Sequence, residues 1–199
     1  MTLLARSATV FLVLAMTPAP ALAGDGAQKA AVCAGCHGAD GNSPNPEWPK
    51  LAGQHAGYLR AQATAFRDGA RQNAMMSPMA ANLTDADIAD IADHFAAQKI
   101  KPGTARADLV ATGEQLYRGG NGQNGIPACM SCHSPTGAGN PAAGYPAVGG
   151  QHAVYTAKQL TAYKNGERTT DVNAVMRTIA GRMSAAEIEA VASYIEGLH

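Results

Sequence analysis

Apolar residues recur at the spacing of one helix face in two similar segments of the chain. They are Ile88, Ile91, Ala92 and Phe95 in the first segment, and Ile188, Val191, Ala192 and Ile195 in the second. Apolar positions three or four residues apart are typical of amphipathic helices. Thr84 and Ser184 precede the segments as N-cap residues. An acidic residue follows each cap three positions later, as in a capping box. We therefore predict helices that begin directly after Thr84 and Ser184.

Two further helix patterns precede each of these segments. The predicted ranges are 25–34 and 56–67 in the first half, and 105–118 and 153–164 in the second. Gly- and Pro-rich loops join the helices, and no stretch shows the alternation that is typical of a strand. The fold class predicted from these patterns is all-α, with three helices in each half.

The two halves of the chain match each other segment by segment. Residues 49–55 match 146–152, residues 66–71 match 163–168, and residues 83–88 match 183–188. The order is preserved and only small insertions intervene, so the chain is a duplication. A helix pattern stops at Pro102-Gly103. We predict two tandem domains, at residues 24–101 and 102–199.

The first 23 residues have the pattern of a secretory signal peptide. Arg6 supplies a basic start, Val10 to Met16 an apolar stretch, and Ala21-Leu22-Ala23 a small-X-small cleavage site. The apolar stretch is too short for an ordinary membrane-spanning helix. We expect cleavage before Gly24 and export to the periplasm; the alternative is an uncleaved N-terminal anchor.

Charge argues against a nucleic-acid partner. The chain has 15 basic and 15 acidic residues, which gives no positive field for a phosphate backbone. Aromatic residues make up only 5% of the chain. Two small domains with few large side chains have thin cores, so a bulky apolar cofactor would supply missing core volume.

The sequence Cys-X-X-Cys-His occurs twice and uses all four cysteines. The copies are Cys33-Ala-Gly-Cys36-His37 and Cys129-Met-Ser-Cys132-His133. This spacing is typical of c-type haem attachment, in which two thiols bind the vinyl groups and the histidine binds the iron. We predict two covalent haem c groups. Two disulfides are an alternative that leaves each adjacent histidine unexplained. A metal-binding or thiol-redox module that uses each Cys-X-X-Cys is a further alternative.

Methionine is the first candidate for the second axial ligand of each iron. The candidates are Met75, Met76, Met79, Met176 and Met183. Counted back from the capping residue of the last helix, Met76 and Met176 are the only pair that matches in both halves. We therefore predict these two as ligands, with core packing as the alternative. Met183 matches Leu83 and Met79 matches Ile179, so both are predicted to fill the core.

The histidines outside the two motifs are weaker ligand candidates. His55 and His152 repeat in a Gly-Gln-His context just before a predicted helix. We expect a surface or capping role for both rather than iron ligation. His94 matches Tyr194, and His199 is terminal, so neither is predicted to bind iron.

The order of these motifs resembles the dihaem cytochrome c4 family over essentially all of residues 24–199. The segments 36–43, 82–88 and 190–198 carry the resemblance most closely. It implies two class I cytochrome c folds related by a pseudo-twofold axis, with His37 and Met76 on one iron and His133 and Met176 on the other. It also implies that the carbonyls of Pro49 and Pro146 accept a hydrogen bond from the proximal histidines. Arg71 and Arg168 match positions that face haem propionates, with a solvated helix end as the alternative.

With both axial positions filled, such a protein is an electron carrier rather than an enzyme. We expect a quinol-oxidising complex or a dehydrogenase as donor and a terminal oxidase as acceptor, through small, transient interfaces. Peripheral membrane association is left open. The alternatives are the cytochrome subunit of a flavin-dependent sulfide dehydrogenase and, from the enzyme class, a dihaem peroxidase.

Overall fold

The computed structural model describes residues 25–199, so the predicted signal peptide lies outside the described part of the chain. Every regular element among the described residues is helical, apart from two isolated β-bridges. The all-α prediction is therefore confirmed. No helix in residues 25–199 is long and apolar enough to cross a membrane.

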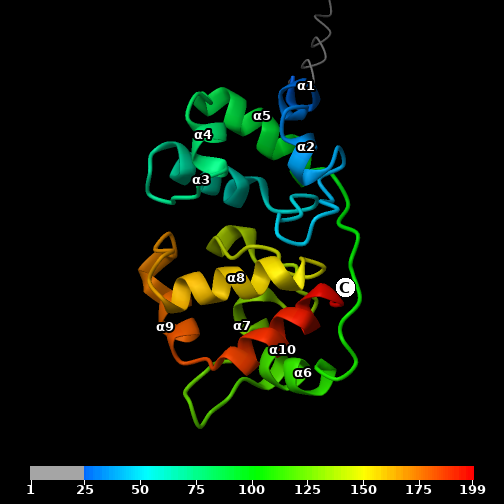
Figure 1. Cartoon of the computed structure of the whole chain (residues 1–199), viewed down its shortest axis with the longest axis vertical. Coiled ribbons are helices and arrows are strands. Elements are labelled where there is room, and N and C mark those ends of the chain that lie inside the picture. Colours follow the sequence, from blue (N-terminus) through cyan, green and yellow to red (C-terminus); the bar gives the residue numbers. More distant parts are fainter. Residues whose placement is uncertain (1–24) are drawn as a thin grey trace, which may run out of the picture.

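The helices form two stacked groups, one above the other in Figure 1. Domain 1 contains α1 (Gly26–Ala30), α2 (Ala34–His37), α3 (Ala56–Arg67), α4 (Met76–Ala80) and α5 (Asp85–Ala96). Domain 2 contains α6 (Val110–Gly119), α7 (Met130–His133), η1 (Pro141–Ala143), α8 (Ala153–Lys164), η2 (Val172–Ala174), α9 (Val175–Gly181) and α10 (Ala185–Glu196). The principal helix packings, such as α1 on α5 and α6 on α10, fall within one group or the other. A helix-free segment along one edge connects them, and the boundary at 101/102 within it stays a prediction.

The helices predicted from the strongest patterns are confirmed. α3 and α8 have the predicted bounds, and α5 and α10 begin directly after Thr84 and Ser184. Both caps form complete capping boxes, in which the cap hydroxyl accepts from the third backbone N–H and the acidic side chain accepts from the cap N–H. Local sequence therefore determines where these helices start.

The first helix of each domain is shorter than predicted. Range 25–34 is interrupted after Ala30 because Cys33 N–H donates to the Ala30 carbonyl, a tight turn that ends α1. Range 105–118 is wrong at its start, since α6 begins at Val110. The N–H of Arg106 donates to the Ser193 hydroxyl at 2.9 Å, which holds the preceding residues against α10 instead of in a helix.

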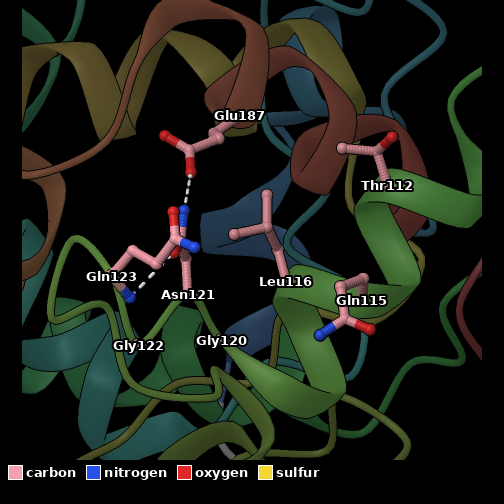
Figure 2. Close-up of a pocket in the computed structure, with 8 residues that line it drawn as sticks. All are labelled: Thr112, Gln115, Leu116, Gly120, Asn121, Gly122, Gln123 and Glu187. Carbon is pink, nitrogen blue, oxygen red and sulfur yellow. Dashed lines mark hydrogen bonds between the residues drawn. The ribbon is translucent and has the colours of Figure 1, made fainter.

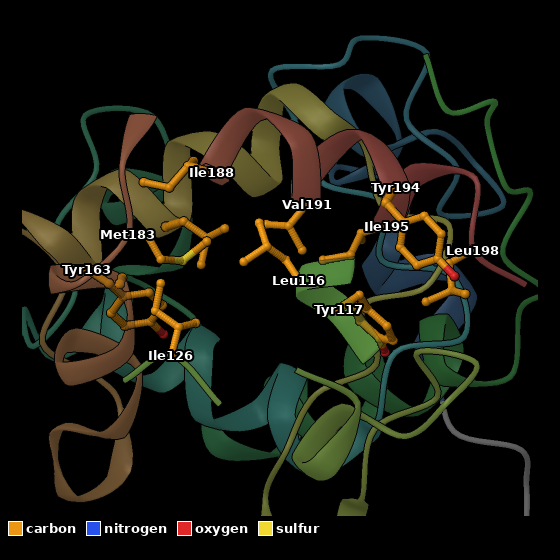
Figure 3. Packing of buried hydrophobic residues seen from close by; sticks show 12 residues of the cluster. Leu116, Tyr117, Ile126, Tyr163, Met183, Ile188, Val191, Tyr194, Ile195 and Leu198 are labelled. Atoms are coloured by element: carbon orange, nitrogen blue, oxygen red, sulfur yellow. The ribbon is translucent and has the colours of Figure 1, made fainter. Parts of the chain in front are cut away.

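A glycine lets the first and last helices of each domain cross closely. A Cβ on Gly26 would lie 2.5 Å from the Asp90 carbonyl oxygen, and one on Gly113 only 2.4 Å from that of Ala190. Both distances are too short for a real side chain, so each crossing requires glycine. The core of domain 2 (Figure 3) surrounds this crossing. Met183 is 2% exposed within that core, which confirms its predicted role.

Candidate functional site

Each Cys-X-X-Cys-His motif forms a single helical turn, α2 in domain 1 and α7 in domain 2. The first cysteine is the N-cap, and the histidine N–H donates to its carbonyl at 2.9 Å in both domains. Residues at this spacing share one helix face, so the two thiols and the imidazole of a motif lie together. These short turns were not predicted from the sequence.

A prolyl carbonyl fixes the ring of each motif histidine. Nδ1 of His37 lies 2.8 Å from the carbonyl oxygen of Pro49, and Nδ1 of His133 lies 2.9 Å from that of Pro146. A carbonyl oxygen only accepts, so Nδ1 carries the proton in each ring. The lone pair is then on Nε2, as an iron ligand requires. The hydrogen bonds expected from Pro49 and Pro146 are confirmed.

Burial also favours the neutral form of the two imidazole rings, which is the form that can bind iron. It lowers the pKa of His37 and of His133, although the prolyl carbonyl opposes the shift in each case. A lowered pKa keeps the imidazole neutral at physiological pH, and only a neutral imidazole binds a metal. The donor set of each motif therefore fits a haem c group.

The four cysteines are free thiols in the structure, so it contains neither of the two disulfides considered above. Burial raises the pKa of Cys33, and it raises the pKa of Cys129 to about 11. A protonated thiol is a poor redox nucleophile. The raised pKa values therefore disfavour the thiol-redox alternative at Cys33 and Cys129.

The two predicted methionine ligands stand at the start of short helices rather than in plain loops. Met76 is the first residue of α4, Met176 is the second residue of α9, and both are half-buried. The core prediction for Met79 is wrong: α4 turns Ala80 inward, and Met79 is 49% exposed. Iron ligation by Met76 and Met176 stays a prediction.

The two repeated histidines differ in burial, because His55 is half-buried and His152 is buried against domain 1. His55 and His152 occupy the N-cap positions of α3 and α8, but neither side chain makes a capping hydrogen bond. The predicted surface or capping role is wrong for His152, which is 8% exposed. Its Nε2 donates to the Ser43 carbonyl of domain 1 at 2.8 Å. Nε2 of His55 is buried and has no hydrogen-bond partner among residues 25–199.

Two equivalent glutamines join the domains through backbone groups. The Gln54 amide donates to the Ala147 carbonyl at 2.8 Å and accepts from the Ala147 N–H at 3.0 Å. Gln151 makes the same pair of bonds with Lys50, both at 2.9 Å. The matching contacts have the relationship that a pseudo-twofold axis between the domains requires.

Arg71 and Arg168 also lie in this boundary, where α3 and α8 face each other (Figure 1). Arg71 donates to Tyr155 and Gln159 of domain 2, and Arg168 donates to Tyr58 and Gln62 of domain 1. These bonds were not predicted from the sequence. The repeat contained the signal, because every partner recurs at the same relative position in both halves. The expected contact with propionates stays a prediction.

Figure 2 shows a surface depression beside the loop at residues 121–127, a segment of domain 2 that has no counterpart in domain 1. The Asn121 amide donates to the Glu187 carboxylate at 2.8 Å, and its oxygen accepts from the Gln123 N–H at 3.1 Å. None of the motif cysteines or histidines lines it. The hydrogen bond from Asn121 to Glu187 therefore holds the loop against the start of α10. The depression is not part of either haem site.

The comparisons with known proteins agree with this geometry. The cytochrome c family matches residues 23–98 and again residues 110–199. A cytochrome c4 of Pseudomonas aeruginosa is 50% identical over 96% of this chain and 97% of its own length. The crystal structure of reduced recombinant cytochrome c4 from Pseudomonas stutzeri superposes with a TM-score of 0.86 at 47% identity, covering 89% of this chain and 98% of that one. A thiosulfate dehydrogenase electron acceptor of Thiomonas intermedia is 40% identical over 84% of this chain and 78% of its own.

Proposed function

Because this chain belongs to the cytochrome c4 family of dihaem electron carriers, we propose that it carries electrons in the periplasm from a quinol-oxidising complex or a dehydrogenase to a terminal oxidase. One observation supports this most directly. Each domain holds a Cys-X-X-Cys-His turn whose imidazole is fixed by a prolyl carbonyl at 2.8 to 2.9 Å.

The residues proposed to hold the two haem c groups divide evenly between the domains. Cys33 and Cys36 attach one haem and Cys129 and Cys132 the other, with the axial pairs His37–Met76 and His133–Met176. When bound, each haem supplies an iron that alternates between the ferric and ferrous states. The prolyl bonds hold the imidazoles in one tautomer.

A filled sixth position is what separates this carrier from a peroxidase. Peroxide chemistry needs an iron with an open position, whereas a methionine in each domain would close both. If the ferrous holoprotein binds carbon monoxide readily at neutral pH, or turns over peroxide, the closed-site proposal is lost.

A sulfur-compound dehydrogenase is a second candidate for the donor. The relative named as a thiosulfate dehydrogenase electron acceptor covers most of this chain at 40% identity. A subunit role in a flavin-dependent sulfide dehydrogenase belongs to the same class. Co-purification with such an enzyme would favour a subunit, and reduction by it without stable association would favour a free carrier.

The function is tested by following the oxidation state of the purified holoprotein in a reconstituted system. Washed membranes from the source organism supply the quinol-oxidising complex and the oxidase, with a quinol or thiosulfate as reductant. We expect reduction that depends on quinol, followed by reoxidation that stops when the oxidase is inhibited. Absence of both steps would contradict the carrier role. Fractionation of intact cells tests the periplasmic location and any peripheral membrane association.

A further inference from the structure

The two domains hold their predicted methionine ligands by different means. In domain 1 the segment before Met76 is short, and the Asn73 side-chain oxygen accepts the N–H groups of Met75 and Met76 at 2.9 and 3.0 Å. This neutral amide caps the start of α4. In domain 2 the segment between Arg168 and Met176 is longer. In domain 2 a charged side chain, instead of an amide, accepts a backbone N–H group beside the methionine.

That residue is Asp171, whose side chain is only 3% exposed. One carboxylate oxygen accepts from the Arg177 guanidinium at 2.8 Å, and the other accepts from the Arg177 backbone N–H at 2.9 Å. Burial opposes the charged carboxylate, but the two bonds from Arg177 outweigh it and keep the pKa of Asp171 below its ordinary value. The carboxylate thus binds both the side chain and the backbone N–H of Arg177, the residue next to Met176.

The segment that this contact closes is strained. Asn173 and Ala174, just before Met176, have φ values of 54° and 56°. Only one other non-glycine residue among residues 25–199, Ser134, has a positive φ. Left-handed conformations are unfavourable for most residues with a Cβ and persist where neighbouring contacts enforce them. Asparagine tolerates this conformation, so the strain lies mainly at Ala174, and a contact that spans the segment would hold it in place.

We propose that Asp171 is the positioning residue of the domain 2 iron site: its contact with Arg177 holds the strained segment closed and so keeps Met176 on the iron. This inference rests on the proposed ligation by Met176. Without the contact, the strain favours a loop conformation in which the methionine leaves the iron. Domain 1 has no equivalent charge pair, since Ser77 stands where domain 2 has Arg177.

Imidazole binding to the ferric holoprotein measures how often each methionine leaves its iron. An added ligand binds only to the open form, so its apparent affinity rises in proportion to the open population. Loss of a hydrogen-bonded charge pair is large enough to raise that population about tenfold. We expect Asp171→Asn to increase imidazole affinity about tenfold at one haem and leave the other unchanged. Asp171→Ala, which removes both bonds, has a larger effect.

Three variants control this experiment. Asp108→Asn makes the same chemical change in an exposed ion pair of domain 2, with Arg106 at 2.7 Å, and should leave both affinities unchanged. Asn73→Ala removes the cap of domain 1 and should affect only the other haem. Arg177→Gln removes the ion pair but keeps the backbone N–H of residue 177 as a donor to Asp171. This variant replaces Asp171→Asn in the experiment if Asp171→Asn does not fold.

The outcomes separate this inference from the ligand assignment on which it rests. Met176→Ala should abolish one methionine-to-iron absorption band and open that haem to imidazole. If it does not, the ligand assignment fails. If it does, but Asp171→Asn and Arg177→Gln leave both affinities within about twofold of wild type, the positioning role is overturned. Equal shifts at both haems would also overturn it, because they indicate general loosening.

Discussion

Arg71 and Arg168 belong to different domains, yet both donate to the same two amide oxygens. The Gln62 oxygen accepts from Arg71 at 2.8 Å and from Arg168 at 2.9 Å. The Gln159 oxygen accepts from Arg71 at 2.7 Å and from Arg168 at 2.9 Å. Among the described residues, no carboxylate bonds to either guanidinium. The amide oxygens of Gln62 and Gln159, one from each domain, therefore hold the two positively charged guanidinium groups close together.

Replacement of Arg168 should weaken the contact between the domains. Arg168 is 6% exposed and its bonds reach Tyr58, Gln62 and Gln159. Arg168→Met keeps the length of the side chain but removes the donor to the Tyr58 hydroxyl and one of the two donors to each glutamine oxygen. We expect a loss of about 2 kcal/mol in the free energy of unfolding, measured by urea denaturation of the holoprotein.

Arg71→Met is the matched comparison at the equivalent position. Arg71 is more exposed, and water can replace its bonds more readily, so the loss should be smaller. Equal effects of the two substitutions would argue that burial does not determine the strength of this contact.

The crossing of α6 and α10 should not tolerate even one methyl group. Gly113→Ala places a Cβ 2.4 Å from the Ala190 carbonyl oxygen, so the helices must separate. We expect a net destabilisation of about 1 to 3 kcal/mol, which thermal unfolding of the holoprotein measures. Gly57→Ala is the control, because Gly57 is also helical and its Cβ would meet nothing within 4 Å. It should be neutral or slightly stabilising, since alanine favours a helix.

Acid should weaken the start of α5 through its capping box. Hydrogen bonds from Thr84 and Lys29 lower the pKa of Asp87 to about 2 from an ordinary value of 3.8. A carboxylate with a lowered pKa stabilises the fold above its unfolded pKa and loses that effect as pH falls through the folded value. Stability from Asp87 is therefore complete above about pH 4 and is lost towards pH 2.

Asp87→Asn removes this dependence. We expect its urea midpoint to fall less than that of wild type between pH 5 and pH 2, a range chosen to bracket both pKa values. Asp25→Asn, at a position whose side chain makes no capping bond, should keep the wild-type slope. An Asp87→Asn midpoint that falls as steeply as wild type would contradict this role.

A helix boundary could be predicted from the sequence where it is set by residues nearby in the chain, and not where it is set by a distant contact. The bounds of α3 and α8 and the starts of α5 and α10 were predicted because periodicity and capping act within a few residues. The start of α6 was not, because a distant hydroxyl, that of Ser193, takes the Arg106 N–H. A helix as short as α4 is not stable in isolation, so its position could not be predicted from local sequence.

The site shows the same division. Its attachment residues follow from the repeated motif, and the prolyl acceptors Pro49 and Pro146 follow from the resemblance to the cytochrome c4 family. The burial of His152 and the exposure of Met79 do not, because each depends on which surfaces the two domains turn towards each other and towards solvent.

The central claim, two iron sites closed by Met76 and Met176, is tested most directly by redox-titrated visible spectroscopy of Met76→His and Met176→His. Each single variant should lose roughly half of the methionine-to-iron absorption, since each haem contributes one such bond, and the double variant should lose all of it. Each replacement should also shift the midpoint potential of one haem and leave the other in place. An unchanged band in either single variant would contradict the assignment of that methionine.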